Sequence, residues 1–167
     1  MNDINWPEKY LPGTTDNVVS NEVIVASLTS AQVWPYLNDT KHSSYYKNAS
    51  EVGFEDGAGP ELGAGVRFRF TTFGMRVEAE VTEYVPPSKG HPARLSFRAW
   101  IAGSTPEVAS SLHAWLIEDL PGGRVRVLTQ ESQIGDPAKQ MAKMKPNPLL
   151  NAHQDWLEGL VQIAAAS

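Results

Sequence analysis

The stretch Val66-Arg-Phe-Arg-Phe-Thr-Thr-Phe-Gly-Met-Arg-Val-Glu-Ala-Glu-Val81 alternates apolar and charged side chains over most of its length. This period of two is typical of β-strands with one buried face, and the Phe-Gly step in the middle predicts a turn. When Thr72 is paired with Met75, apolar residues face each other on one side, and arginines face glutamates on the other. The stretch therefore predicts a hairpin that buries Phe68 and Phe70 and exposes its ion pairs.

Further strands and helices are expected on both sides of this hairpin. The patterns predict strands over residues 21–28, 49–55, 94–102, 108–118 and 124–134, and helices over residues 29–40, 41–48, 138–145 and 149–166. Thr29-Ser-Ala-Gln32 is a capping-box pattern that begins the first helix. Apolar residues recur at helical spacing in the last segment, which is long enough for about 27 Å of helix.

This order of elements predicts an α+β fold. A curved antiparallel sheet of about seven strands is expected to wrap around a long C-terminal helix, with two short helices after strand one. Such an arrangement leaves space between the sheet and the helix. Residues 1–17 are expected to form an irregular lead-in, and residues 18–167 a single domain.

The composition excludes several classes of function. The chain has 167 residues, of which 41% are hydrophobic and 20% charged, with a net charge of −5 and no cysteine. Thiolate catalysis and cysteine-based zinc sites are therefore excluded, and the acidic balance argues against binding to nucleic acid. No window approaches the length of apolar sequence that would span a bilayer, so we expect no membrane insertion and a cytoplasmic location.

Five local patterns follow one another along residues 18–165. They are Val33-Trp-Pro-Tyr-Leu-Asn-Asp39, Gly63-Ala-Gly65 before Val66-Arg-Phe68, Val81-Thr-Glu-Tyr-Val-Pro-Pro87 followed by Leu95-Ser-Phe97, His113-Ala-Trp115 with Pro121-Gly-Gly123 and Glu131, and His153-Gln-Asp-Trp-Leu-Glu-Gly-Leu160. In this order they resemble the START-related superfamily, also called SRPBCC, and in particular its polyketide-cyclase-like members. The resemblance implies a helix-grip fold with an internal pocket. It leaves the function open, because carriers, enzymes and chaperone-ATPase activators share this fold.

His113 and Glu131 are the candidate polar pair of such a pocket. Pairing Ile117 with Val125 in the last hairpin places Glu131 diagonal to His113 on one face of the sheet. Periodicity leaves open whether this face or the apolar face of Leu112 points inward, and the resemblance implies that the His/Glu face does. A buried carboxylate requires a partner. The pair is therefore a satisfied polar pair, a group that orients a ligand, or the candidate catalytic acid and base.

The other candidate ligand-binding residues are mostly aromatic. They are Trp34, Tyr45, Tyr46, Phe68, Phe70, Phe97, Trp115, Met144 and Trp156. Core packing is the alternative role of the aromatic residues, and a loop-capping contact is the alternative for Met144. The four histidines show no metal-ligand spacing, and no Gly-x-Gly-x-x-Gly motif is present, so we expect neither a metal nor a cofactor.

Three functions are compatible with this sequence. The first hypothesis is binding, without turnover, of a hydrophobic or polycyclic small molecule in the cavity between sheet and C-terminal helix. The alternative is an enzyme of the polyketide cyclase or aromatase type that acts on a poly-keto substrate. A second alternative is an interaction module similar to the chaperone-ATPase activators. We expect a monomer or homodimer whose partner is an apolar small-molecule ligand.

Overall fold

The structure, a computed structural model, describes all residues from 1 to 167. The elements are, in chain order, η1 (Glu8–Tyr10), β1 (Asn17–Ala26), α1 (Ser30–Asn38), η2 (Thr40–Tyr45), β2 (Ser50–Phe54), β3 (Arg67–Thr72), β4 (Met75–Val85), β5 (Ala93–Ile101), β6 (Ser110–Leu120), β7 (Arg124–Ile134), α2 (Asp136–Lys143) and α3 (Pro148–Ala165). The elements η1 and η2 are 3₁₀ helices.

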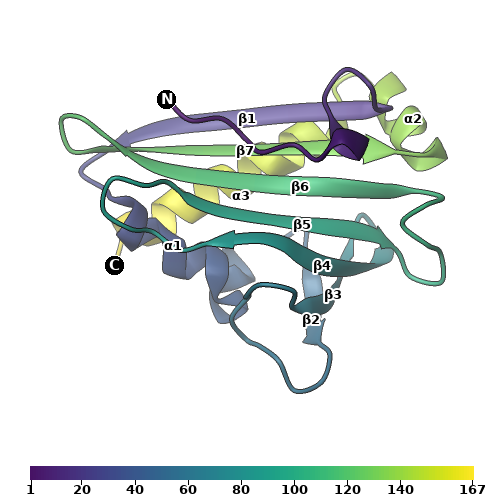
Figure 1. Cartoon of the computed structure of the whole chain (residues 1–167), viewed down its shortest axis with the longest axis horizontal. Helices are drawn as coiled ribbons and strands as arrows, with labels where there is room; N and C mark the ends of the chain where they lie inside the picture. Colours follow the sequence, from purple (N-terminus) through teal and green to yellow (C-terminus); the bar gives the residue numbers. More distant parts are fainter.

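All seven strands form one antiparallel sheet in the order β1-β7-β6-β5-β4-β3-β2. The long helix α3 crosses one face of this sheet, and the N-terminal segment crosses the opposite face (Figure 1). The two short helices, α1 and η2, follow β1 as expected. The α+β helix-grip architecture predicted from the sequence is therefore confirmed.

The hairpin formed by β3 and β4 has the predicted register. Thr72 pairs with Met75, and Arg67 pairs with Glu80, whose side chains form an ion pair at 3.7 Å. Arg69 also lies opposite a glutamate, but its guanidinium packs over Gly53 of β2, where a Cβ atom would come within 2.9 Å of it. The charged face points away from α3, as the alternation predicted.

The hairpin formed by β6 and β7 has a register that differs from the predicted one by two residues. Ile117 pairs with Val127 rather than with Val125, and His113 lies directly opposite Glu131. The reason is the turn. Leu120 and Arg124 are the last paired residues of the hairpin, and the turn between them consists of residues 121–123, Pro-Gly-Gly. Both glycines of the turn adopt a positive φ, which glycine tolerates best. A shift of two residues preserves the face on which each side chain lies.

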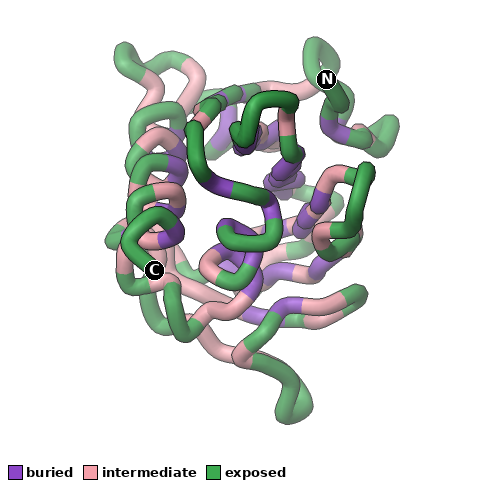
Figure 2. Tube along the Cα trace, turned by 90° about the vertical axis from the view of Figure 1, so that its left-hand side faces the viewer, coloured by how far each residue is buried: buried purple, intermediate pink, exposed green.

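The main core lies between the sheet and α3. Trp115 from β6 and Leu157 and Leu160 from α3 are among its fully buried side chains. Figure 2 shows the buried residues on the side of α3 that is turned toward the sheet. None of the helices combines the length and apolar character that crossing a bilayer would require.

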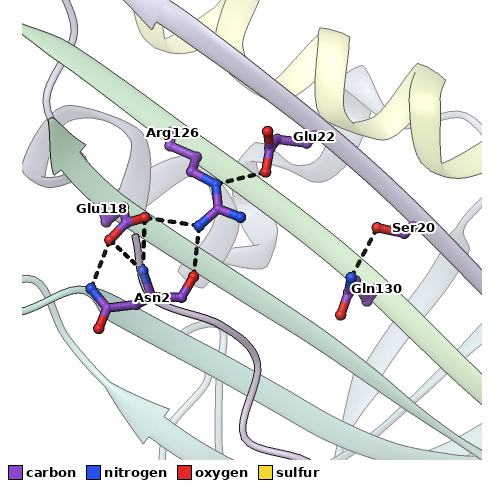
Figure 3. A network of polar contacts seen from close by, with 6 residues as sticks. All are labelled: Asn2, Ser20, Glu22, Glu118, Arg126 and Gln130. Atoms are coloured by element: carbon purple, nitrogen blue, oxygen red, sulfur yellow. Dashed lines mark hydrogen bonds and ion pairs between the residues drawn. The ribbon is translucent and has the colours of Figure 1, made fainter. Parts of the chain in front are cut away.

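The N-terminal segment covers part of the outer face of the sheet. Ile4 and Trp6 pack against a small apolar cluster formed by residues 114, 116 and 128. Beside this cluster the backbone carbonyl of Asn2 accepts a hydrogen bond from Arg126 at 2.7 Å. The side-chain amide of Asn2 donates a hydrogen bond to Glu118, also at 2.7 Å (Figure 3). The irregular lead-in is thus fixed to the sheet by apolar and polar contacts.

Candidate functional site

A cavity of about 130 Å³ lies between the inner face of the sheet and the helices α2 and α3. Hydrophobic residues make up 15 of the 23 that line it, and no lysine, arginine or aspartate is among them. Phe73, at the tip of the β3–β4 hairpin, lines the cavity and is 38% exposed, so the cavity reaches the surface there. The result is an apolar chamber with a polar cluster on one wall.

This polar cluster consists of His113 from β6, Glu131 from β7 and His153 from α3. His153 Nε2 lies 3.0 Å from Glu131 Oε2, and His113 Nδ1 lies 3.6 Å from the same oxygen. All three side chains are buried, and the two imidazole rings stack with centroids 4.3 Å apart. Three elements distant in sequence therefore bring two imidazoles and one carboxylate together at the cavity wall.

Thr129 determines which nitrogen of His113 carries hydrogen. The Thr129 hydroxyl donates to the carbonyl oxygen of Ala114 at 3.3 Å and lies 2.8 Å from His113 Nε2. When the single hydrogen of the hydroxyl is donated to Ala114, Nε2 is the donor in the second contact. His113 Nδ1 then presents a lone pair toward Glu131.

A chain of side-chain amides holds Glu131 from the other side. Asn147, which caps α3 by accepting from the Leu149 N–H, donates to Asn17 at 2.8 Å. Asn17 donates to Gln133 at 2.8 Å, and Gln133 donates to Glu131 Oε1 at 3.0 Å. Each amide has its orientation set by its neighbour, so Glu131 Oε1 acts as an acceptor in a fully connected network.

Burial and neighbouring groups shift the pKa values of two members of the cluster. Burial, reinforced by the neighbouring His153 imidazole, lowers the pKa of His113 to about 3. Burial alone would raise the pKa of Glu131, but the hydrogen bond from His153 and the nearby imidazoles lower it to about 2. At neutral pH Glu131 is therefore a carboxylate and His113 a neutral imidazole.

The cluster has the composition of a metal site but not its geometry. The candidate donor atoms of His113, Glu131 and His153 all lie within 4.8 Å of one another. The imidazole planes, however, are inclined by only 11°. Imidazole nitrogens bind metals through lone pairs that lie in the ring plane, and two parallel planes do not direct these lone pairs to one point. Coordination would require at least one ring to rotate, so the arrangement is that of a hydrogen-bonded cluster.

An aromatic layer continues the wall beside the cluster. Trp156 stacks on Tyr46 with centroids 4.2 Å apart, and its indole nitrogen donates to the Tyr45 hydroxyl at 3.1 Å. The Tyr45 hydroxyl donates in turn to the Tyr36 carbonyl. Tyr46 accepts from Asn48, and burial raises its pKa to about 12, so it keeps a hydrogen available for donation.

Most, but not all, of the candidates from the sequence lie at the cavity. Those that line it are Tyr46, Phe70, Phe97, His113, Glu131 and Trp156. Trp34, Phe68 and Trp115 are buried in the core instead, and Tyr45 supports Trp156 from behind. Met144 is 54% exposed because α2 ends one residue before it, whereas Met141, one turn earlier, lines the cavity.

His153 is the member of the polar cluster that sequence reasoning did not select. Its position on the apolar face of the last helix, three residues before Trp156, was a usable signal. Gln133 lies two residues after Glu131, and therefore on the same face of β7, where it contributes the amide that fixes the carboxylate.

One solved structure is similar to this chain in both sequence and fold. It is the crystal structure of hypothetical protein jhp0584 from Helicobacter pylori, with 47% identity over 98% of this chain and 97% of that chain, and a TM-score of 0.90. The chain belongs to the same family as this Helicobacter pylori protein. The near-complete coverage of both chains shows that these two proteins share the whole fold.

More distant structures share the fold alone. Protein MLL2253 from Mesorhizobium loti has 16% identity, covers 90% of this chain and 98% of its own, and gives a TM-score of 0.64. Ara h 8.0201, of the Bet v1-like helix-grip type, has 13% identity, covers 90% and 100%, and gives a TM-score of 0.55. No protein-family model and no curated protein matches the chain.

Proposed function

We propose that the protein binds a small, largely apolar molecule in the cavity between the sheet and α3. The observation that carries this proposal is the cavity itself, which combines an apolar lining with one convergent polar cluster. Ligand sites typically have this composition, in which the apolar surface provides affinity and a few polar groups provide orientation. The Bet v1-like neighbour supports ligand binding in general and supports placing the fold in the START-related (SRPBCC) superfamily.

The size of the cavity limits the ligand. Its volume of about 130 Å³ is close to the roughly 150 Å³ of an engineered cavity that binds benzene. A single aromatic ring or a short branched chain fits such a space. Polycyclic molecules do not fit without movement of α2 or of the β3–β4 hairpin, so we favour a compact ligand over the polycyclic class.

A thermal-shift and titration series tests this proposal. Toluene and indole should raise the melting temperature, whereas cholesterol should not. A ligand present at 100 times its dissociation constant stabilises the folded state by about 2.7 kcal/mol, which such an assay resolves. Failure of every single-ring compound to bind would contradict the proposal.

A cavity-filling variant provides the matched control. Ala99 lines the cavity from β5, so Ala99→Leu should fill part of it and weaken binding of toluene. Ala31 is exposed on α1, so Ala31→Leu makes the same chemical change away from the cavity and should leave binding unchanged. Equal affinity in both variants would place the ligand elsewhere.

The position of His113 and Glu131 on the cavity wall favours a second candidate function, acid–base catalysis of the cyclase or aromatase type on a keto substrate. In this case the pair would remove a proton beside a carbonyl group and return it after ring closure. Unchanged turnover of a poly-keto substrate by His113→Ala would remove this candidate. Cytoplasmic location and the monomeric or homodimeric state stay predictions of the sequence.

A further inference from the structure

We propose that the ligand of this cavity is an organic cation, namely a compact molecule with a protonated amine that the cluster of His113, Glu131 and His153 receives. This inference rests on the proposed function and specifies the chemical class of the ligand. It follows from three independent features: the charge of the cavity wall, the hydrogen-bonding capacity of the cluster and the aromatic surroundings.

The first feature is a buried carboxylate that has no permanently charged partner. Glu131 is the only carboxylate that lines the cavity, and no lysine or arginine lines it. The nearest groups, His113 and His153, are imidazoles rather than permanent cations. A buried carboxylate without a positive partner is unfavourable. A cationic ligand would supply the missing charge, whereas an anionic ligand would place a second negative charge beside the first.

The second feature is an excess of hydrogen-bond acceptors. In the tautomer in which His113 donates from Nε2 to Thr129, its Nδ1 and Glu131 Oε2 are two acceptors 3.6 Å apart. His153 Nε2 lies against the same Oε2 at 3.0 Å, and its Nδ1, on the opposite side of the ring, is buried without a partner. An ammonium group has three donors and no acceptor, so it can donate to both His113 Nδ1 and Glu131 Oε2.

The third feature is the aromatic lining. Tyr46, Phe97 and Trp156 line the cavity around the cluster, and the Trp156 ring lies edge-to-face against His113 with centroids 5.2 Å apart. Aromatic rings attract cations through their negative faces, most strongly when water is excluded. The same rings provide the apolar contact that the body of the ligand requires.

A matched series of single-ring compounds tests the inference on the whole chain. Benzylamine, benzyl alcohol and benzoate have nearly the same size and differ in charge at pH 7. Isothermal titration should give the order benzylamine, benzyl alcohol, benzoate, with at least about a tenfold preference for the amine over the alcohol. Comparable or tighter binding of the alcohol would overturn the inference and leave the proposed function standing. Absence of binding by all three compounds would overturn both.

Isosteric variants assign the preference to the carboxylate. Glu131→Gln should reduce the preference for benzylamine to less than about threefold and retain binding of benzyl alcohol. Glu158 is exposed on the same helix as His153, so Glu158→Gln is the matched control and should bind as the parent does. Retention of the full amine preference in Glu131→Gln would contradict the assignment.

Two measurements on the unmodified protein address competing cations. Nitrogen-15 chemical shifts of the imidazoles should show His113 uncharged at pH 7 in the ligand-free protein. An imidazolium there would overturn the inference, because the cluster would then hold its own cation. Tight Zn²⁺ binding that excludes benzylamine would overturn it as well.

Discussion

Arg126 on β7 donates a hydrogen bond of 2.8 Å to Glu118 on β6, and both side chains are only 7% exposed. The pair lies on the outer face of the sheet, where Asn2 from the N-terminal segment binds both partners (Figure 3). Arg126 also contacts Glu22, which is 41% exposed. The two contacts of one guanidinium thus differ mainly in their access to water.

Removal of Arg126, which leaves the buried Glu118 without its counter-charge, should be far more costly than removal of the exposed Glu22. Arg126→Ala leaves Glu118 buried without a counter-charge, and we expect a loss of about 2–3 kcal/mol in the free energy of unfolding. This is below the 3–5 kcal/mol of a deep interior pair because only the thin N-terminal segment covers the site. Glu22→Ala should cost less than about 1 kcal/mol. Urea denaturation measures both, and equal losses would contradict the assignment.

Gly159 allows α3 to approach Tyr45. A Cβ atom at this position would lie 2.8 Å from the Tyr45 ring, which hydrogen bonds to Tyr36 and Trp156 hold in place. Gly159→Ala should gain about 1 kcal/mol of helix propensity but lose about 1–3 kcal/mol through overpacking. We expect net destabilisation in urea denaturation. In a Tyr45→Ala background only the backbone carbonyl of residue 45, 3.3 Å from the added Cβ, remains close, so the loss should shrink; an unchanged loss there would disprove the contact with the ring.

The stability of the protein should fall as the pH decreases below about 6.5. The folded protein holds His113 neutral, with a pKa of about 3, whereas the unfolded chain binds a proton near pH 6.5. The unfolded state therefore binds more protons between these two values, and stability is lost at about 1.4 kcal/mol per pH unit. Glu131, with its folded pKa of about 2, adds a second loss below about pH 4.5.

Comparison of two histidine variants isolates this effect. His113→Gln should flatten the dependence of unfolding free energy on pH between about 6.5 and 4.5. His42 is exposed on η2, so His42→Gln should retain the slope of the parent protein. Identical slopes in the parent and in His113→Gln would show that another group is responsible.

The capping box at the start of α1 should contribute about 1 kcal/mol. The Thr29 side chain accepts from the Gln32 N–H, and the Gln32 side chain accepts from the Thr29 N–H. Thr29→Ala removes the acceptor and should cost about that amount, while Thr29→Ser keeps it and should cost less than about 0.5 kcal/mol. Equal effects of the two substitutions on the urea midpoint would argue against a capping role.

The features predicted correctly from the sequence are those that local patterns determine. The register of residues 66–81 was predicted because both faces of the hairpin, apolar and charged, require the same pairing. The capping-box pattern of residues 29–32 correctly predicted where α1 begins, because Thr29 is the N-cap of this helix. The order of the elements predicted a curved sheet around a long C-terminal helix. The resemblance to the START-related superfamily identified this arrangement as a helix-grip fold.

The features that were missed depend on turn geometry or on tertiary packing. The pairing of Ile117 required the length of the turn at residues 121–123, which alternation alone does not reveal. His153 joins His113 and Glu131 only after α3 has packed across the sheet, so no sequence spacing connects the three. Met144 lies outside the cavity because it falls just beyond the end of α2.

The three-residue turn between β6 and β7 has a consequence for how this family tolerates change in sequence. Surface turns are usually where insertions and deletions accumulate. Here one inserted residue that re-paired β7 by a single step would turn Glu131 to the outer face and bring Gln130 or Ser132 inward. His113 is seven residues from Leu120, or about 23 Å along the strand. The length of a distant turn thus determines which side chains of β7 reach the cavity.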